Sequence, residues 1–391
     1  MDGTQPPDSS RPWSEWLERH SPTQMTGANL HHPDIHRPWS DWSEAQTLHM
    51  VVVYNNPFRW RTRRELVNDC IRHLRHTPNV QTYVVELAYG RRPFEVTGEN
   101  PLDIQLRTDV EMWHKENLIN LGVSRFPPEA LYGGYTDGDF HFTRHDWALE
   151  AIHMLQHHHF VQLFSAYSDL TAETATSYTG HRPYRIKSSF AWNYLHQKEF
   201  LERKKAEQKI RETTDPYYGL KIPAPVGKWP FGFAPGAPGG AWAWNMDAFT
   251  SVGGMLSTCI LGSGDWHMAF GLADIPSARL ETQYTGRAYN ESIRAWQKRA
   301  SKLKFHPGKS AIGCVDNYAT HFFHGSHNRR GYGDRWQILV RHDFNPVTDI
   351  APDWQGVWRW TGDKPVLRDE VRRYFIERFE DDPSLTENTL A

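Results

Sequence analysis

Two aspartates flank a glycine in the stretch LYGGYTDGDFHF, residues 131–142. Asp137 and Asp139 follow an apolar and aromatic run that predicts a buried strand. Two carboxylates at the end of a strand can hold a divalent cation and leave coordination positions open for a phosphate group. Because Asp-Gly-Asp also occurs in ordinary surface turns, the pair alone does not establish a metal site.

A second group of candidate ligands lies in THFFHGSHNRRGYGDRW, residues 320–336. His321 and His324 are three residues apart, and imidazoles at this spacing can bind one metal ion from a turn or a helix. The arginines that follow could neutralise phosphate. A lone histidine pair is more often a packed or surface feature. In QHHHF, residues 156–160, adjacent side chains point in different directions, so we interpret these histidines as structural.

Asp265 lies in a Gly/Ser-rich turn between two apolar stretches, within residues 248–272. A carboxylate in such a turn can be partly desolvated and act as a general base. The alternative is an ordinary N-cap for the helix that the following residues, WHMAFGL, predict. The two interpretations are compatible with each other.

The elements that must position these side chains alternate along the chain. Apolar β-branched runs predict buried strands, and apolar residues at helical spacing predict the helices between them. This order predicts an α/β fold with a largely parallel sheet, in which ligands gather at the carboxyl ends of the strands. The predicted elements are a strand and loop over 48–58, a helix over 62–78 with Leu66, Val67, Cys70, Ile71 and Leu74 on its apolar face, a strand over 80–90, a helix over 109–123 and a strand over 130–136.

Segments on both sides of this core differ in composition. Residues 1–46 hold an imperfect repeat, RPWSEW and RPWSDW, which we interpret as clips docking on the main domain or as an arm that binds a partner or acceptor. The Pro/Gly-rich segment 219–240 predicts a lid or binding loop. An amphipathic helix over 366–380 is predicted to bury Leu367, Val371, Phe375 and Phe379. The expected organisation is an N-terminal extension (1–46), a catalytic domain (47–345) and a C-terminal helical extension (346–391).

Composition limits the setting of the protein. The formal net charge is −2, which indicates no global attraction to nucleic acid or membrane, although basic residues of 59–64 and 198–211 are compatible with a local groove. Cys70, Cys259 and Cys314 do not make a disulfide framework, which fits a reducing compartment. With no signal peptide and no apolar run of about 18 residues, we expect a cytoplasmic protein, in the host cytoplasm if viral, with no membrane partner.

Three blocks of the chain resemble the β-1,4-galactosyltransferase group, whose enzymes have the GT-A nucleotide-sugar fold. They are WHKENLINLGVSRFPPEALYGGYTDGDFHF, GGAWAWNMDAFTSVGGMLSTCILGSGDWHMAF and THFFHGSHNRR, in the same order as in that group. The stretch YNNPFRWRTRRELV also resembles the group's first strand, loop and helix, which touch the nucleotide. The similarity spans roughly residues 48–340 and is patchy between the blocks. The chain also resembles soluble glycosyltransferases of bacteriophages.

The resemblance implies a role for each matching residue. Asp139 would ligate a Mn²⁺ or Mg²⁺ ion that bridges the donor diphosphate, and Asp137 would lie by the ribose and the metal. His324 matches the late metal-binding histidine of the group, and His321 stands where the group has a methionine ligand. Asp265 falls in the acidic turn that supplies the catalytic base, although the group has several acids there after Trp-Gly-Gly and this chain has one, before Trp266. The nucleotide pocket would include Tyr54, Asn55, Pro57, Arg59 and Arg107, with Gly239 and Gly240 near the donor sugar.

The function that follows is a metal-dependent, inverting transfer of a hexose from a UDP-sugar to an acceptor hydroxyl. Candidate acceptors are a cytosolic protein, a glycan intermediate and a hydroxymethylated base in viral DNA. Two other classes stay open from the residues alone. The same Asp and His side chains would serve a metal-dependent hydrolase or nuclease, and the Trp-rich stretches would serve a non-catalytic sugar-binding protein.

Overall fold

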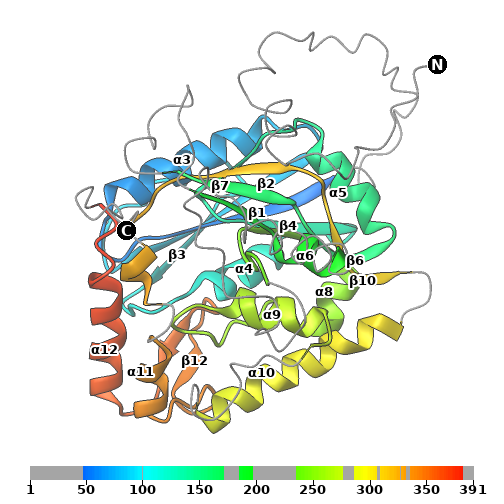
Figure 1. Ribbon diagram of the computed structural model, residues 1–391. Helices are drawn as coiled ribbons and strands as arrows, with labels where there is room; N and C mark the ends of the chain where they lie inside the picture. Colours follow the sequence, from blue (N-terminus) through cyan, green and yellow to red (C-terminus); the bar gives the residue numbers. More distant parts are fainter. Residues whose placement is uncertain are drawn as a thin grey trace, which may run out of the picture.

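The computed structural model describes residues 47–98, 100–170, 185–196, 235–275, 286–305, 309–325, 327–331 and 335–381 (Figure 1). The tryptophan repeats of residues 1–46 and the basic segment 198–211 lie outside these ranges, as do residues 219–234 of the Pro/Gly-rich loop. The predictions made for these segments therefore stay predictions.

A mixed sheet forms the centre of the described part of the chain. Its seven strands follow the order β10-β6-β9-β4-β1-β2-β3. Every pairing is parallel except those of β9, which runs antiparallel to both β4 and β6. The strands are β1 (Leu48–Asn55), β2 (Val80–Tyr89), β3 (Ile104–Thr108), β4 (Tyr132–Thr136), β6 (His158–Gln162), β9 (Ala241–Asn245) and β10 (Ser310–Cys314). The α/β class and the largely parallel sheet are confirmed.

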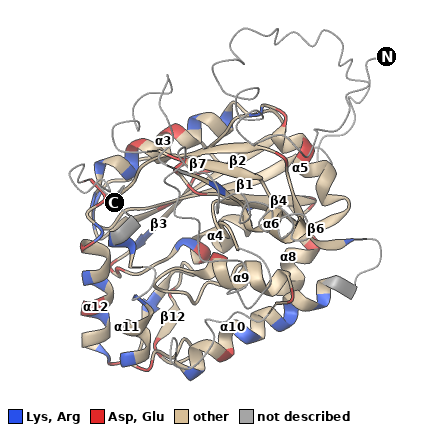
Figure 2. Cartoon of the chain, in the orientation of Figure 1, with Lys and Arg blue, Asp and Glu red and all other residues tan. Residues whose placement is uncertain are grey.

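Helices cover both faces of this sheet (Figure 1). Side chains alternate between the two faces of a strand, so Met50 and Val52 of β1 pack with α3 and α5, while Val51 packs with α4 on the other face. Charged residues lie mostly on the covering helices and few lie on the central strands (Figure 2). The helices are α3 (Arg61–Arg75), α4 (Lys115–Val123), α5 (Trp147–Leu155), α6 (Phe190–Leu195), α8 (Met246–Val252), α9 (Gly264–Leu272), α10 (Arg287–Ala300), α11 (Trp336–Arg341) and α12 (Pro365–Ile376), with short 3₁₀ turns η4 (Ser301–Phe305) and η5 (His327–Arg330).

A second sheet lies beside the carboxyl end of β4. Among the described residues it has four strands in the order β5-β11-β7-β8, namely β5 (Phe140–Phe142), β11 (Tyr318–His321), β7 (Ala166–Asp169) and β8 (Arg185–Ser188). In its register, His321 lies opposite Phe140 on one side and Asp169 on the other. The turn after β4 and the late histidine block are therefore brought together by strand pairing. A separate hairpin joins β12 (Ile350–Pro352) to β13 (Trp358–Trp360).

Several element boundaries differ from those predicted. The helix predicted over 109–123 begins only at Lys115, and strand β3 was not anticipated. Helix α12 ends at Ile376, so Phe379 has a positive φ of 44° and is 44% exposed instead of buried. Leu66 is only half-buried. The other predicted inward residues of the first and last helices are buried: Val67, Cys70, Ile71, Leu74, Leu367, Val371 and Phe375.

Candidate metal centre

The Asp-Gly-Asp turn joins β4 to β5 and lies tightly against helix α3. The amide of Asp137 donates to the carbonyl of Gly240 (2.7 Å), and the amide of Phe322 donates to the carbonyl of Asp139 (2.9 Å). A Cβ atom on Gly138 would overlap the side chain of Val67 on α3, so only glycine fits between the two aspartates. The turn is thus fixed from three sides before any ligand is considered.

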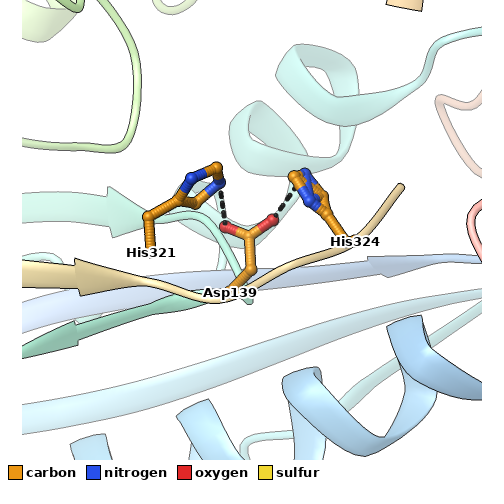
Figure 3. Close-up of side chains that lie close together, drawn as sticks. All are labelled: Asp139, His321 and His324. Atoms are coloured by element: carbon orange, nitrogen blue, oxygen red, sulfur yellow. Dashed lines mark ion pairs between the residues drawn. The ribbon is translucent and has the colours of Figure 1, made fainter. Parts of the chain in front are cut away.

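Asp139, His321 and His324 converge on one point (Figure 3). Nε2 of His324 lies 3.0 Å from Oδ2 of Asp139, and Nε2 of His321 lies 3.7 Å from Oδ1. The candidate ligand atoms of all three residues lie within 4.8 Å of one another. Oδ1 of Asp139 is buried and has no hydrogen-bond partner among the described residues. A buried carboxylate that faces two imidazoles and has one oxygen without a hydrogen-bond partner fits a divalent cation, and three protein ligands leave positions for others.

Burial and neighbouring charges shift the pKa values of these three candidate ligands. Burial raises the pKa of Asp139, but the imidazoles of His324 and His321 outweigh it and hold this pKa well below the usual range. Burial and the neighbouring Arg330 keep the pKa of His324 well below its usual 6.5. Burial also lowers the pKa of His321, yet Asp139 and Asp169 more than compensate and raise it to about 9. At neutral pH one carboxylate and one neutral imidazole are therefore ready to coordinate, and His321 must lose a proton first.

Asp169 orients one of the candidate ligands. It ends strand β7, is 3% exposed, and one of its carboxylate oxygens contacts Nδ1 of His321. A carboxylate on one ring nitrogen fixes the imidazole so that the other nitrogen faces the metal position. Sequence analysis missed Asp169, and nothing in the local pattern AYSD marks it. Only the pairing of β7 with β11 brings it to His321.

Asp137 faces a different partner from Asp139. The ammonium of Lys115, at the start of α4, contacts Oδ1 of Asp137 and lies 4.9 Å from the ring centre of Tyr135. Burial raises the pKa of Asp137, and Lys115 opposes this rise. Asp137 lies outside the group formed by Asp139, His321 and His324, so its predicted share in metal binding stays a prediction.

Asp265 lies in the first turn of α9, and Ser263 is the residue at the N-cap position. A Cβ on Gly239 would overlap Oδ2 of Asp265, so the glycine leaves room for the carboxylate. Glu116 lies beneath the start of the same helix, since a Cβ on Gly264 would lie 2.8 Å from its Oε1. The indole of Trp113 donates to Glu116 (2.8 Å). Burial, with Asp265 adding to it and Lys115 opposing it, raises the pKa of Glu116 to about 7. Sequence analysis did not single out Glu116.

A pocket opens between β1, β4, α3 and α4. Two of the residues predicted to contact the donor, Asn55 and Asp137, line it together with the metal-facing Asp139 and His324. The remaining lining residues are Val53, Arg63, Leu66, Val67, Trp113, Lys115, Ile119, Tyr135, Thr136, Gly138 and Arg378.

Four other predicted nucleotide residues make contacts away from this lining. The hydroxyl of Tyr54 donates to Glu95 (2.5 Å), and Arg59 lies 3.6 Å from the same carboxylate with most of its side chain exposed. Arg107 donates to the carbonyls of Gly90 and Arg92. The carbonyl of Pro57 accepts from Arg92 (2.6 Å). Gly240, with φ of 90°, lies against Phe140 and Phe164, and its carbonyl holds the amide of Asp137 at the start of the turn.

Comparison with known proteins gives little further. No protein-family model matches the chain, and no curated protein sequence matches it. Among solved structures, it is similar to 4-diphosphocytidyl-2C-methyl-D-erythritol synthase from Anaerococcus prevotii, with a TM-score of 0.27 and 7% sequence identity. That similarity covers 70% of this chain and 88% of the other. So distant a similarity assigns no activity to the chain.

The structure also bears on membrane-spanning helices and on the state of the cysteines. In the described ranges, no helix is long and apolar enough to cross a membrane. Cys70, Cys259 and Cys314 are all buried and free.

Proposed function

We propose that the protein is a metal-dependent glycosyltransferase of the GT-A type that moves a hexose from a UDP-sugar to an acceptor hydroxyl with inversion. The observation that carries the proposal is the convergence of Asp139, His321 and His324 beside a pocket at the carboxyl end of β4. In largely parallel sheets this edge is where nucleotides bind.

The candidate ligands and the residues of the pocket wall would have different roles in binding the donor. A divalent cation held by Asp139, His321 and His324 would supply positive charge to the leaving diphosphate. Asp169 keeps His321 in its orientation. Lys115 lies on the pocket wall, where its ammonium can add charge beside Asp137. The apolar side chains of Val53 and Ile119 line the pocket and would exclude water from one side of a bound donor.

Asp265 would accept the proton of the acceptor hydroxyl as that oxygen attacks the sugar. It is half-buried, and its Oδ1 accepts from the amide of Trp266 (2.8 Å), which holds the side chain in place. Glu116 is the alternative candidate for the base. Its charge interacts with that of Asp265, and its raised pKa of about 7 suits proton exchange near neutral pH.

For the acceptor, we propose a cytosolic macromolecule and, first among candidates, hydroxymethylated viral DNA. Arg61 and Arg64 of α3 are basic residues that neighbour the pocket residue Arg63 in the sequence, and Arg61 is exposed. Phosphate contacts of this kind would make DNA binding weaken steeply with salt. A protein or glycan acceptor would respond little to salt.

The test is a panel of nucleotide sugars, with Mn²⁺ and each acceptor class, followed by mass detection of the product. We expect an acceptor heavier by one hexose with a UDP-sugar, and none when the metal is chelated. Release of free hexose without any acceptor product would favour a metal-dependent hydrolase. No consumption of any nucleotide sugar would favour a non-catalytic sugar-binding protein.

A further inference from the structure

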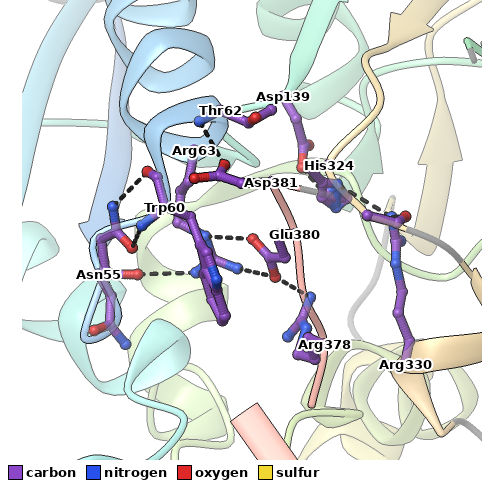
Figure 4. Close-up of polar contacts among 12 residues, drawn as sticks. Asn55, Trp60, Thr62, Arg63, Asp139, His324, Arg330, Arg378, Glu380 and Asp381 are labelled. Atoms are coloured by element: carbon purple, nitrogen blue, oxygen red, sulfur yellow. Dashed lines mark hydrogen bonds and ion pairs between the residues drawn. The ribbon is translucent and has the colours of Figure 1, made fainter. Parts of the chain in front are cut away.

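The chain returns to the pocket after its last helix. Beyond α12, the segment Arg378–Asp381 runs back toward the start of α3 (Figure 4). Glu380 is 1% exposed and pairs with two guanidinium groups. It accepts two hydrogen bonds from Arg63, at 2.9 and 2.6 Å, and lies 2.8 Å from Nη2 of Arg378. Asp381 accepts from the amides of Arg61 and Thr62 at the start of α3, at 2.6 and 2.9 Å.

The two arginines face the same pocket as the candidate metal ligands. Both line it together with Asp139 and His324. Each guanidinium lies over a tryptophan ring, Arg63 over Trp60 at 5.2 Å and Arg378 over Trp113 at 5.7 Å. Stacking of this kind fixes the plane of a guanidinium and leaves its donors directed sideways. Each guanidinium therefore has an orienting contact besides Glu380, and Arg63 also donates to the carbonyl of Asn55 (2.8 Å).

Glu380 satisfies these donors incompletely. One carboxylate serves two guanidinium groups, so the cluster of Arg63, Arg378 and Glu380 keeps one net positive charge. Arg378 is only 5% exposed. Its Nε is buried and has no hydrogen-bond partner among the described residues. Buried donors without partners are costly, and a phosphate group offers three acceptor oxygens and more charge than a carboxylate.

We propose that Arg63 and Arg378 form a binding site for a phosphate group of the nucleotide, and that Glu380 occupies this site until the ligand displaces it. The proposal rests on the proposed function only for the identity of the nucleotide. Glu380 competes with anions for the site, so phosphate binding without metal is weak in the wild-type chain. A nucleotide anchored by a metal ion overcomes this competition, and the segment Arg378–Asp381 moves away from α3.

The test uses inorganic pyrophosphate as the probe, in chelator, with the full-length chain and isothermal titration calorimetry. Glu380→Gln removes the competing charge and keeps the shape of the side chain. We expect it to bind pyrophosphate at least about tenfold more tightly than the wild type, because one charged pair no longer has to be broken. Adding Arg378→Gln to Glu380→Gln should abolish the gain. Glu377→Gln, three residues earlier and exposed, is the matched control and should bind as the wild type does.

Equal affinity of Glu380→Gln and the wild type would overturn the proposal, as would an equal gain in Glu377→Gln. Should Glu380→Gln fail to fold, hydrogen exchange of the wild type decides. Metal-free pyrophosphate, raised to a concentration at which calorimetry shows the wild-type site filled, should speed exchange of the Arg378 and Phe379 amides, which donate to Phe375 and Ile376. Unchanged exchange there would overturn the proposal. Because every arm omits metal, these results are separate from the metal dependence that tests the proposed function.

Discussion

The two sides of the pocket place carboxylates in opposite surroundings. On one side, Asp139 faces two imidazoles, and its pKa is held well below the usual range. On the other side, Asp137 lines the pocket and Glu116 lies outside its lining; Lys115 and Asp265 act on the charge of both, and burial raises the pKa of both. The first side favours a permanently ionised ligand. The second holds one carboxyl group, Glu116, whose pKa of about 7 suits proton exchange near neutral pH.

This difference arises over a short distance in the sequence. Asp137 and Asp139 are separated only by Gly138, yet Asp137 is paired with helix α4, and Asp139 with the end of β11 and the loop that follows it. The aspartate itself is the same in both places, so the partners decide what each can do. Metal-assisted transfer to a hydroxyl requires a ligand group and a proton-exchanging group near it.

The largest effect should come from removing the carboxylate of the ligand side. Asp139→Ala deletes the only anionic candidate ligand of the described group, so we expect Mn²⁺ binding to fall below detection in calorimetry. His157→Ala, which removes an exposed imidazole elsewhere, is the control and should leave Mn²⁺ affinity unchanged. Undiminished binding in Asp139→Ala would move the metal to another place.

At the start of α9, near Glu116, Asp265→Asn keeps the shape of the side chain and removes its basicity. We expect UDP binding to survive and the rate of sugar transfer to fall by roughly 10²–10⁴-fold, the usual contribution of a general base. Single-turnover kinetics separates the two effects. Transfer near the wild-type rate would assign the base to another residue, and Glu116→Gln would then be the next variant to examine.

A smaller effect is expected from the residue that orients His321. Asp169→Asn removes the charge at Nδ1 and should weaken Mn²⁺ affinity by about 10–100-fold, as loss of such an outer partner does. Calorimetric titration of Mn²⁺ measures it directly. Circular dichroism establishes whether the variant is folded. A folded variant with wild-type Mn²⁺ affinity would mean that Asp169 only packs against His321.

Taken per pH unit, the smallest effect is the pH dependence of metal binding. The pKa of His321 is about 9 in the folded protein and its usual value is 6.5, so its protonated form stabilises the metal-free fold below pH 6.5 and this stability is lost as pH rises through 9. A metal ion must displace that proton. Mn²⁺ affinity should therefore rise by up to about tenfold per pH unit between 6.5 and 9. A flat profile would exclude His321 as a ligand, and Asp169→Asn should shift the rise to lower pH.

Local patterns predicted those parts of the fold and site that depend on neighbours in the sequence. The apolar run of β1 predicted a buried strand, and the spacing of Val67, Cys70 and Leu74 on α3 predicted the helix that covers it. Asp139, His321 and His324 were recognised from their residue types and motifs. Glu116 was missed because it lies in a helix whose pattern shows no signal of its contact with α9.

Other contacts depend on pairings that no local pattern contains. Asp169 reaches His321 across 152 residues, through the register of β7 and β11. Arg63 reaches Glu380 across 317 residues, after α12 has ended. The early end of that helix also exposed Phe379, which helical periodicity had placed in the core. Such long-range pairs set the charge of the pocket and could be found only from the folded chain.

The most direct test of the account is whether UDP binds through a metal ion. Thermal unfolding is measured with UDP and Mn²⁺, with UDP and chelator, and with Mn²⁺ alone. With Mn²⁺ present, UDP at about 100 times its Kd should add about 2.7 kcal/mol to the free energy of unfolding. With chelator, the same UDP concentration should add almost nothing. Equal stabilisation by UDP in the two conditions would contradict a nucleotide held through a metal at Asp139, His321 and His324.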